Sequence, residues 1–119
     1  MPEFELTDQI IRASIEARRE LGRSHAEVVY RNAMQAALEE RGIRSAKEVP
    51  IRVHFHGREV GFFRGDLLVE DRVLVERNAG RPLEESHAAQ LLAYLRASGI
   101  RVGLLIHIGD TVTLRRVVL

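Results

Sequence analysis

Two acidic residues, Asp66 and Glu76, stand inside consecutive apolar runs of the sequence. A carboxylate within a strand is costly to bury unless it is paired, hydrogen-bonded or bound to a metal ion. The polar segment Glu70-Asp71-Arg72 between the two runs predicts a three-residue hairpin loop. Such a loop pairs Val69 with Val73, and it places Asp66 opposite Glu76 with their Cβ atoms roughly 5 Å apart. Two hard oxygen ligands at that spacing suit a divalent cation.

This metal hypothesis depends on the register of the hairpin. A two-residue loop would place the two acids on opposite faces of the sheet. A structural alternative is that Asp66 pairs with Arg64 and Glu76 pairs with Arg77 in ordinary salt bridges. The spacing of the residues does not separate these two interpretations.

A third acid, Glu27, has two competing interpretations. The segment Ser24-His25-Ala26-Glu27 fits the capping box, in which the glutamate accepts a hydrogen bond from the N-cap amide. A carboxylate used in this way is poorly placed to reach a functional site. The sequence favours capping over a role as a ligand.

Polar side chains also recur on a predicted helix. His87, Gln90 and Tyr94 are spaced by three and four residues and therefore share one helix face. Such a stripe can simply be a solvated face, but apolar residues on both sides of Gln90 predict that it is partly buried and points at a partner. His107 follows a predicted buried strand and is a candidate to line a pocket, although a lone histidine is more often structural.

Composition limits the possible classes of protein. The chain has 119 residues, of which 45% are hydrophobic and 29% charged, as expected for a single globular domain over residues 1–119. The net charge of +1 provides no overall basic field, and the lack of cysteine excludes disulfides and thiolate metal sites. No apolar run approaches the roughly 20 residues of a membrane span. Residues 1–5 lack the features of a signal peptide, so we expect a cytoplasmic protein that has no contact with membranes.

The periodicity of apolar residues predicts an α/β (α+β) fold. Helices are predicted over residues 7–21, with Thr7 as N-cap, 24–41 and about 84–97, each ending at a glycine. Strands are predicted over residues 49–55, 60–69, 73–75, 102–106 and 111–118. The order α-α-β-β-β-α-β-β indicates a mixed sheet flanked by helices, in which the crossover helix makes the fourth strand parallel to the third.

Several segments, in this order, resemble those of a known family. They are G-x(4)-E-x-x-Y in residues 22–30, R-x-D-L-L-V in residues 64–69, V-E-R-N in residues 75–78, H-x-x-Q-L-L-x-Y-L in residues 87–95 and G-L-L-I-H in residues 103–107. Together they span most of the chain and resemble the GxxExxY proteins, small bacterial members of the PD-(D/E)XK nuclease-like superfamily.

The resemblance implies a fold and a reaction. The superfamily has a mixed sheet flanked by helices, as the periodicity also predicts. The acids equivalent to Asp66 and Glu76 hold Mg²⁺ or Mn²⁺ in active members, and a helix glutamate such as Glu27 can complete the metal site. The expected catalytic residues are these three acids together with Asn78 and Gln90. The implied reaction is metal-dependent hydrolysis of phosphodiester bonds in DNA or RNA.

Asn78 departs from the family pattern, in which a lysine occupies this position. Asn78 and Glu76 share a strand face, whereas Arg77 points the other way and cannot easily replace the missing ammonium group. Asparagine can orient a water molecule but supplies no charge, and losing one electrostatic element costs on the order of 100-fold in rate. A second departure is His107, where the family has asparagine. The alternative function is therefore a non-catalytic module that binds nucleic acid or a protein partner, including a second copy of itself as a homodimer.

Overall fold

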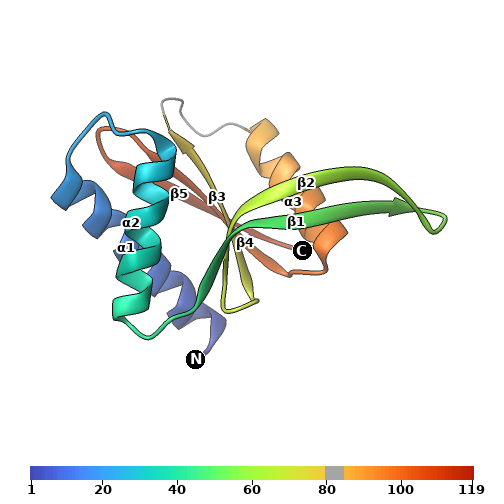
Figure 1. Cartoon of the computed structure of the whole chain (residues 1–119), viewed down its shortest axis with the longest axis horizontal. Helices are drawn as coiled ribbons and strands as arrows, with labels where there is room; N and C mark the ends of the chain where they lie inside the picture. Colours follow the sequence, from blue (N-terminus) through green and yellow to red (C-terminus); the bar gives the residue numbers. More distant parts are fainter. Residues whose placement is uncertain (80–84) are drawn as a thin grey trace.

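A mixed β-sheet lies between two groups of helices in the computed structural model of the protein (Figure 1). The structure describes residues 1–79 and 85–119, with the backbone alone for Asn78 and Ala79. In chain order the elements are α1 (Glu3–Leu21), α2 (Glu27–Glu40), β1 (Ser45–Phe55), β2 (Arg58–Val69), β3 (Val73–Ala79), α3 (Glu85–Ser98), β4 (Val102–Ile108) and β5 (Val112–Val118). The predicted element order and the mixed sheet are confirmed.

The strands lie in the sheet in the order β1-β2-β3-β4-β5. Strands β3 and β4 run parallel, as the predicted crossover through α3 requires, and the other neighbouring strands are antiparallel. β1 forms one edge of the sheet, which explains how Pro50 is tolerated within it. Helices α1 and α2 cover one face of the sheet, and α3 covers the other (Figure 1).

Each face of the sheet has its own apolar core. The core under α1 and α2 contains, among others, Leu6, Ile10, Met34, Leu38, Leu67, Val69, Val73, Val75, Leu104 and Ile106. The core under α3 contains Ile51, Leu74, Ala88, Leu91, Leu95 and Leu105. Val75 therefore faces α1 and α2, while its neighbour Leu74 faces α3. This assignment of faces decides where the candidate site residues on β3 point.

Both N-terminal helices begin elsewhere than predicted. The first begins at Glu3 with Pro2 as N-cap, and Thr7 is buried within it, where its Oγ1 donates to the carbonyl oxygen of Phe4 at 2.9 Å. The capping box is also wrong, because α2 begins at Glu27 with Ala26 as N-cap and no side-chain capping bond. Ser24 instead lies in the preceding loop with φ of 70°.

The other boundaries differ from the prediction at the ends of elements. β1 and β4 extend further than predicted, to Ser45 and Ile108. The predicted chain break at Gly80-Arg81-Pro82 and the predicted helix start near Glu84 lie outside the described residues. None of the helices in the described ranges is long and apolar enough to cross a membrane.

Strands β1 and β2 form a long hairpin that reaches across α3 (Figure 1). The residues of β2 that pair with β3 are Leu67–Val69, and the rest of β2 pairs with β1 alone. We call residues 49–65 the β1–β2 arm. One contact with α3 is the stacking of Phe63 on Tyr94, whose ring centroids lie 4.9 Å apart.

The close packing of α3 against the sheet depends on Gly103. A Cβ atom at this position would lie 2.8 Å from Leu91 Cδ2 and 2.9 Å from Leu91 Cγ, closer than carbon atoms tolerate. We expect Gly103→Ala to lower the free energy of unfolding by about 1–3 kcal/mol, because α3 must shift to relieve the clash. Gly61→Ala is the matched control, since its nearest neighbour would be 3.5 Å away. Equal urea midpoints for the two variants would contradict this packing.

Candidate active site

The β2–β3 hairpin has the predicted register. Val69 pairs with Val73, Leu68 with Leu74 and Leu67 with Val75. The connecting residues are Glu70-Asp71-Arg72, and the first two adopt positive φ angles of 52° and 56°. The predicted three-residue loop is confirmed, and its register leads to Asp66 opposite Glu76.

Glu76 binds the main chain of Asp66. The Glu76 Oε1 atom accepts a hydrogen bond from the Asp66 N–H at 3.0 Å. The β2–β3 pairing stops just before this point, at Leu67 and Val75. The Glu76 side chain thus supplies an acceptor for the Asp66 N–H, and this contact fixes the side chain at the end of the paired segment.

The Asp66 carboxylate is held by two arginines. Arg77 donates from Nε to Oδ2 at 2.6 Å and from Nη2 to Oδ1 at 3.2 Å, and Arg31 Nη1 lies 3.6 Å from Oδ1. All three side chains are largely buried, with exposed fractions of 17% for Asp66, 4% for Arg77 and 10% for Arg31. Arg77 also donates from Nη1 to the carbonyl oxygen of Glu27. This network ties α2 to β2 and β3, and it differs from the simple salt bridges that we considered from the sequence.

The prediction that both carboxylates point to one face is wrong. Glu76 follows Leu74 in the alternation of β3 and faces α3, whereas the Asp66 carboxylate meets Arg31 of α2. The alternation of β2 breaks at Asp66, where the opposite residue in β1, Glu48, has φ of 52° and the β1–β2 pairing skips one position. Arg77 faces α2, away from Glu76 as predicted, and its guanidinium attracts the Asp66 carboxylate to that side.

A small pocket gathers most of the other predicted site residues. Its volume is about 210 Å³, and its lining is Glu27, Glu76, Arg77, His87, Gln90, Leu91 and Leu105. Gln90 is exposed at this pocket rather than partly buried as predicted. Tyr94, on the same helix face, instead packs on Phe63 of the arm, and His107 lies against Gly109. The structure therefore brings Glu27, Glu76, His87 and Gln90 together, with Asp66 beside them.

The environment of Glu76 raises the pKa of its carboxyl group to about 7. Burial is the main cause, and the negative charges of Asp66 and Glu27 act in the same direction. The hydrogen bond from the Asp66 N–H and the charge of Arg77 oppose the increase. The three acids therefore share one electrostatic field, and a cation beside Glu76 would relieve both the burial of its charge and the repulsion.

The donor set suits a hard divalent cation, although the acids are not arranged around one point. Within residues 1–79 and 85–119, no three His, Asp or Glu side chains are placed to hold a metal ion together. Carboxylate oxygens are the ligands that Mg²⁺ and Mn²⁺ prefer. For Asp66 to join Glu76 on a cation, its carboxylate must exchange Arg77 for the metal.

Tyr30 fixes the loop that precedes Glu27. Its hydroxyl donates to the carbonyl oxygen of Gly22 at 2.6 Å and accepts from the His25 N–H at 3.3 Å. The tyrosine is 2% exposed, and the rings of His25 and Tyr30 meet edge to face. The G-x(4)-E-x-x-Y spacing thus has a structural reason, because the tyrosine closes the loop and places Glu27 in the first turn of α2.

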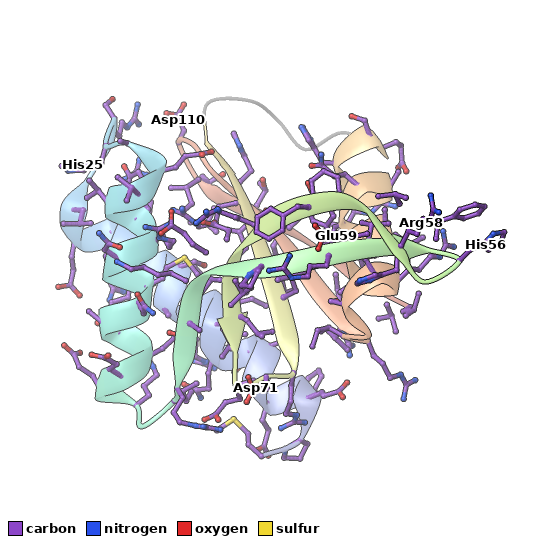
Figure 2. All side chains as sticks on the ribbon, turned by 45° about the vertical axis from the view of Figure 1, so that its right-hand side comes forward. His25, His56, Arg58, Glu59, Asp71 and Asp110 are labelled. Carbon is purple, nitrogen blue, oxygen red and sulfur yellow. The ribbon has the colours of Figure 1, made fainter. Side chains whose placement is uncertain are left out.

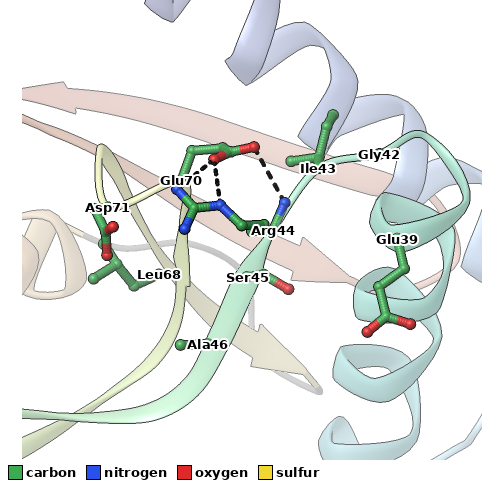
Figure 3. A pocket seen from close by; sticks show the side chains of 9 residues that line it. All are labelled: Glu39, Gly42, Ile43, Arg44, Ser45, Ala46, Leu68, Glu70 and Asp71. Carbon is green, nitrogen blue, oxygen red and sulfur yellow. Dashed lines mark hydrogen bonds and ion pairs between the residues drawn. The ribbon is translucent and has the colours of Figure 1, made fainter.

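A larger pocket, of about 560 Å³, lies beside the β2–β3 turn (Figure 3). On its wall the Arg44 main-chain N–H and side-chain Nε both donate to the Glu70 carboxylate at 3.2 Å. This pairing lowers the pKa of Glu70, chiefly through the main-chain hydrogen bond. Arg44 and Glu70 neutralise each other at this pocket (Figure 3). We therefore place the candidate site at the smaller acidic pocket.

The sequence profile of the PD-(D/E)XK nuclease superfamily matches residues 4–117. The chain belongs to this superfamily. No curated protein sequence matches the chain. The PD-(D/E)XK assignment agrees with the predicted superfamily and with the observed order of helices and strands.

Solved structures share this PD-(D/E)XK fold at low sequence identity. One is the crystal structure of SSO0001, with a TM-score of 0.54 and 16% identity over 94% of this chain and 76% of that one. Another is an alkaline exonuclease (LHK-Exo) from Laribacter hongkongensis, with a TM-score of 0.54 and 15% identity. That match covers 85% of this chain and 63% of the exonuclease chain. At these identities the similarity shows the fold alone.

Two residues beside the candidate site were not predicted from the sequence. Arg31 and Arg77 hold Asp66, but Arg77 was excluded from the site by strand alternation and Arg31 was not considered. An arginine within the apolar face of a predicted helix was the available signal, because a charged side chain is rarely buried without a partner. The side chain of Asn78, predicted to share a face with Glu76, lies outside the described residues.

Proposed function

We propose that this PD-(D/E)XK domain is a metal-dependent nuclease that hydrolyses phosphodiester bonds in DNA or RNA. The observation that carries the proposal is the gathering of Glu27, Glu76 and Gln90 at one pocket, with Asp66 adjacent. Within the superfamily we further propose that the chain is a GxxExxY protein. The role of Tyr30 in placing Glu27 supports this finer assignment.

The proposed metal ligands are Asp66, Glu76 and Glu27. Bound Mg²⁺ or Mn²⁺ would supply a Lewis acid for the phosphoryl group and would lower the pKa of a coordinated water molecule. Glu76 lines the pocket while its Oε1 atom accepts from the Asp66 N–H, which leaves its second carboxylate oxygen for a cation. The Gln90 amide, exposed at the same pocket, can donate to a phosphate oxygen and accept from water.

Asn78 has a limited proposed role. As the residue in the position of the superfamily lysine, it can orient the attacking water by hydrogen bonds but cannot stabilise charge. We therefore expect turnover to be slow compared with that of an enzyme that has the lysine, by on the order of 100-fold. Asn78→Lys is expected to raise the rate.

The test is cleavage of single-stranded and double-stranded DNA and RNA with Mg²⁺ or Mn²⁺. We expect Glu76→Gln to lower the cleavage rate by about 100-fold or more and to abolish Mn²⁺ binding in calorimetry. Glu40→Gln, an exposed acid at the end of α2, is the matched control and should change neither quantity. Cleavage by Glu76→Gln at the rate of the control would overturn the proposal.

The second candidate is a module of the same fold that binds nucleic acid or a protein partner without catalysis. The specific observation that favours it is the pairing of Asp66 with Arg77 and Arg31, which already neutralises a proposed metal ligand. Absence of Mn²⁺ binding and of cleavage, together with salt-dependent binding of DNA or RNA, would support this candidate. Tight Mn²⁺ binding that Glu76→Gln removes would exclude it.

A further inference from the structure

The β1–β2 arm carries basic and aromatic side chains on the face that points away from α3. Arg52 and Phe62 are cross-strand partners, and the Arg52 guanidinium lies 5.1 Å from the centre of the Phe62 ring. The Arg64 guanidinium lies 5.8 Å from the same centre. Phe62 remains 43% exposed. We call Arg52, Phe62 and Arg64 the arm strip.

The arm strip leads along β2 to Asp66, the acid that lies beside the candidate active site. Phe63 stacks on Tyr94 of α3, and a Cβ atom on Gly65 would point at Leu74 in the core under α3. The alternate residues Phe62, Arg64 and Asp66 therefore share the opposite face. At a rise of about 3.3 Å per residue, Phe62 lies roughly 13 Å along the strand from Asp66.

The charge of the arm strip is available to a ligand. No carboxylate of a described residue pairs with Arg64. Arg52 pairs with Glu59 at 2.6 Å, but both side chains are about half exposed, and such a pair contributes little energy. The tip of the arm extends beyond the helices and exposes His56 and Arg58 (Figure 2). A chain of net charge +1 thus concentrates three arginines and one glutamate in the arm.

We propose that the arm strip binds single-stranded nucleic acid and directs it toward Asp66. A base would stack on Phe62, and phosphates would contact Arg52 and Arg64. Exposed rings between cations are the arrangement that binds single strands, because the bases of a duplex are stacked on each other and hidden from a protein ring. This inference rests on the proposed function only for the kind of ligand, which is a nucleic acid. It adds that the nucleic acid is single-stranded and that it lies along β2 toward Asp66.

The test is fluorescence anisotropy of a labelled oligothymidylate of about 12 nucleotides, in EDTA so that no cleavage occurs. We expect Phe62→Ala to weaken the affinity by about 10-fold. Arg64→Ala should weaken it and reduce the slope of log affinity against log salt concentration by about 0.7. A duplex of the same length should bind more weakly and should not respond to Phe62→Ala.

Matched controls separate this surface from general charge and hydrophobicity. Phe4→Ala removes a ring that is 75% exposed on α1, and Arg116→Ala removes an exposed arginine on β5 at the other sheet edge. The inference is overturned if the arm variants bind as the controls do, if the duplex is preferred, or if no oligonucleotide binds. Cleavage that depends on Glu76, combined with unchanged affinity of the arm variants, would overturn this inference alone. Binding that depends on the arm strip without any cleavage would instead count against the proposed nuclease function alone.

Discussion

Replacing Arg77 with methionine is expected to lower the free energy of unfolding by about 3 kcal/mol. The Arg77 side chain is 4% exposed and holds both carboxylate oxygens of Asp66. Methionine retains much of the apolar stem but leaves the carboxylate with Arg31 alone, 3.6 Å away. Breaking a buried ion pair from one side is costly because the remaining charge is left without compensation. Urea denaturation at pH 7 measures the loss.

A variant without the charged network and an exposed ion pair provide the controls. Asp66→Asn combined with Arg31→Met and Arg77→Met removes all three charges, so we expect it to recover much of the stability lost in Arg77→Met. Arg12→Met breaks a pair with Asp8 whose side chains are 65% and 48% exposed, and it should cost less than about 1 kcal/mol. If Arg77→Met costs no more than Arg12→Met, the buried network does not stabilise the fold.

The second large effect concerns the pH dependence of stability. The carboxyl group of Glu76 has a pKa of about 7 in the folded protein, against an ordinary value of 4.5. As the pH rises from 4.5 to 7, the unfolded chain loses this proton before the folded chain does, so ionisation favours unfolding. Above pH 7 Glu76 is ionised in both the folded and the unfolded chain. The whole pKa difference then lowers the free energy of unfolding by about 3 kcal/mol. Glu76→Gln cannot ionise and is therefore expected to be more stable than the wild-type protein at pH 8.

The measurement compares unfolding of the two proteins between pH 5 and pH 8. The stability advantage of Glu76→Gln should grow by about 2 kcal/mol over this range. Glutamine keeps an oxygen that can accept from the Asp66 N–H, so the main local contact survives. Glu40→Gln, which changes an exposed acid, should leave the pH profile unchanged. Parallel profiles for the wild-type protein and Glu76→Gln would show that Glu76 ionises normally. A stable Glu76→Gln variant would also mean that its loss of Mn²⁺ binding is not due to unfolding.

The hairpin that carries the two acids could be predicted because residues close together in the sequence determine its loop and its register. Two apolar runs of three residues flank Glu70-Asp71-Arg72, and a loop of that length fixes the register. The helix ends were also local features, since Gly22 and Gly99 adopt φ of 79° and 77°, which glycine alone adopts readily. The mixed sheet followed from the order of these local elements.

The direction of the Asp66 side chain could not be predicted because it depends on distant residues. Strict alternation along β2 would have placed its carboxylate beside Glu76. The carboxylate instead lies on the other face. It pairs there with Arg31 of α2, which is distant in the sequence, and the backbone of β1 is distorted opposite it at Glu48. The capping box failed for a related reason. Tyr30 folds the loop before α2 through Gly22 and His25, and this contact takes precedence over a side-chain cap by Ser24.

The sheet places every strand beside its neighbour in the sequence, in the order β1 to β5. A chain built from its N-terminus can therefore add each strand to an edge that already exists, and the antiparallel hairpins need only short loop closures. All the groups that meet at Asp66 precede α3 in the chain. They are Arg31, Arg77 and the Glu76 carboxyl. The acidic half of the site can thus assemble during synthesis, before the helix that supplies His87 and Gln90 has emerged.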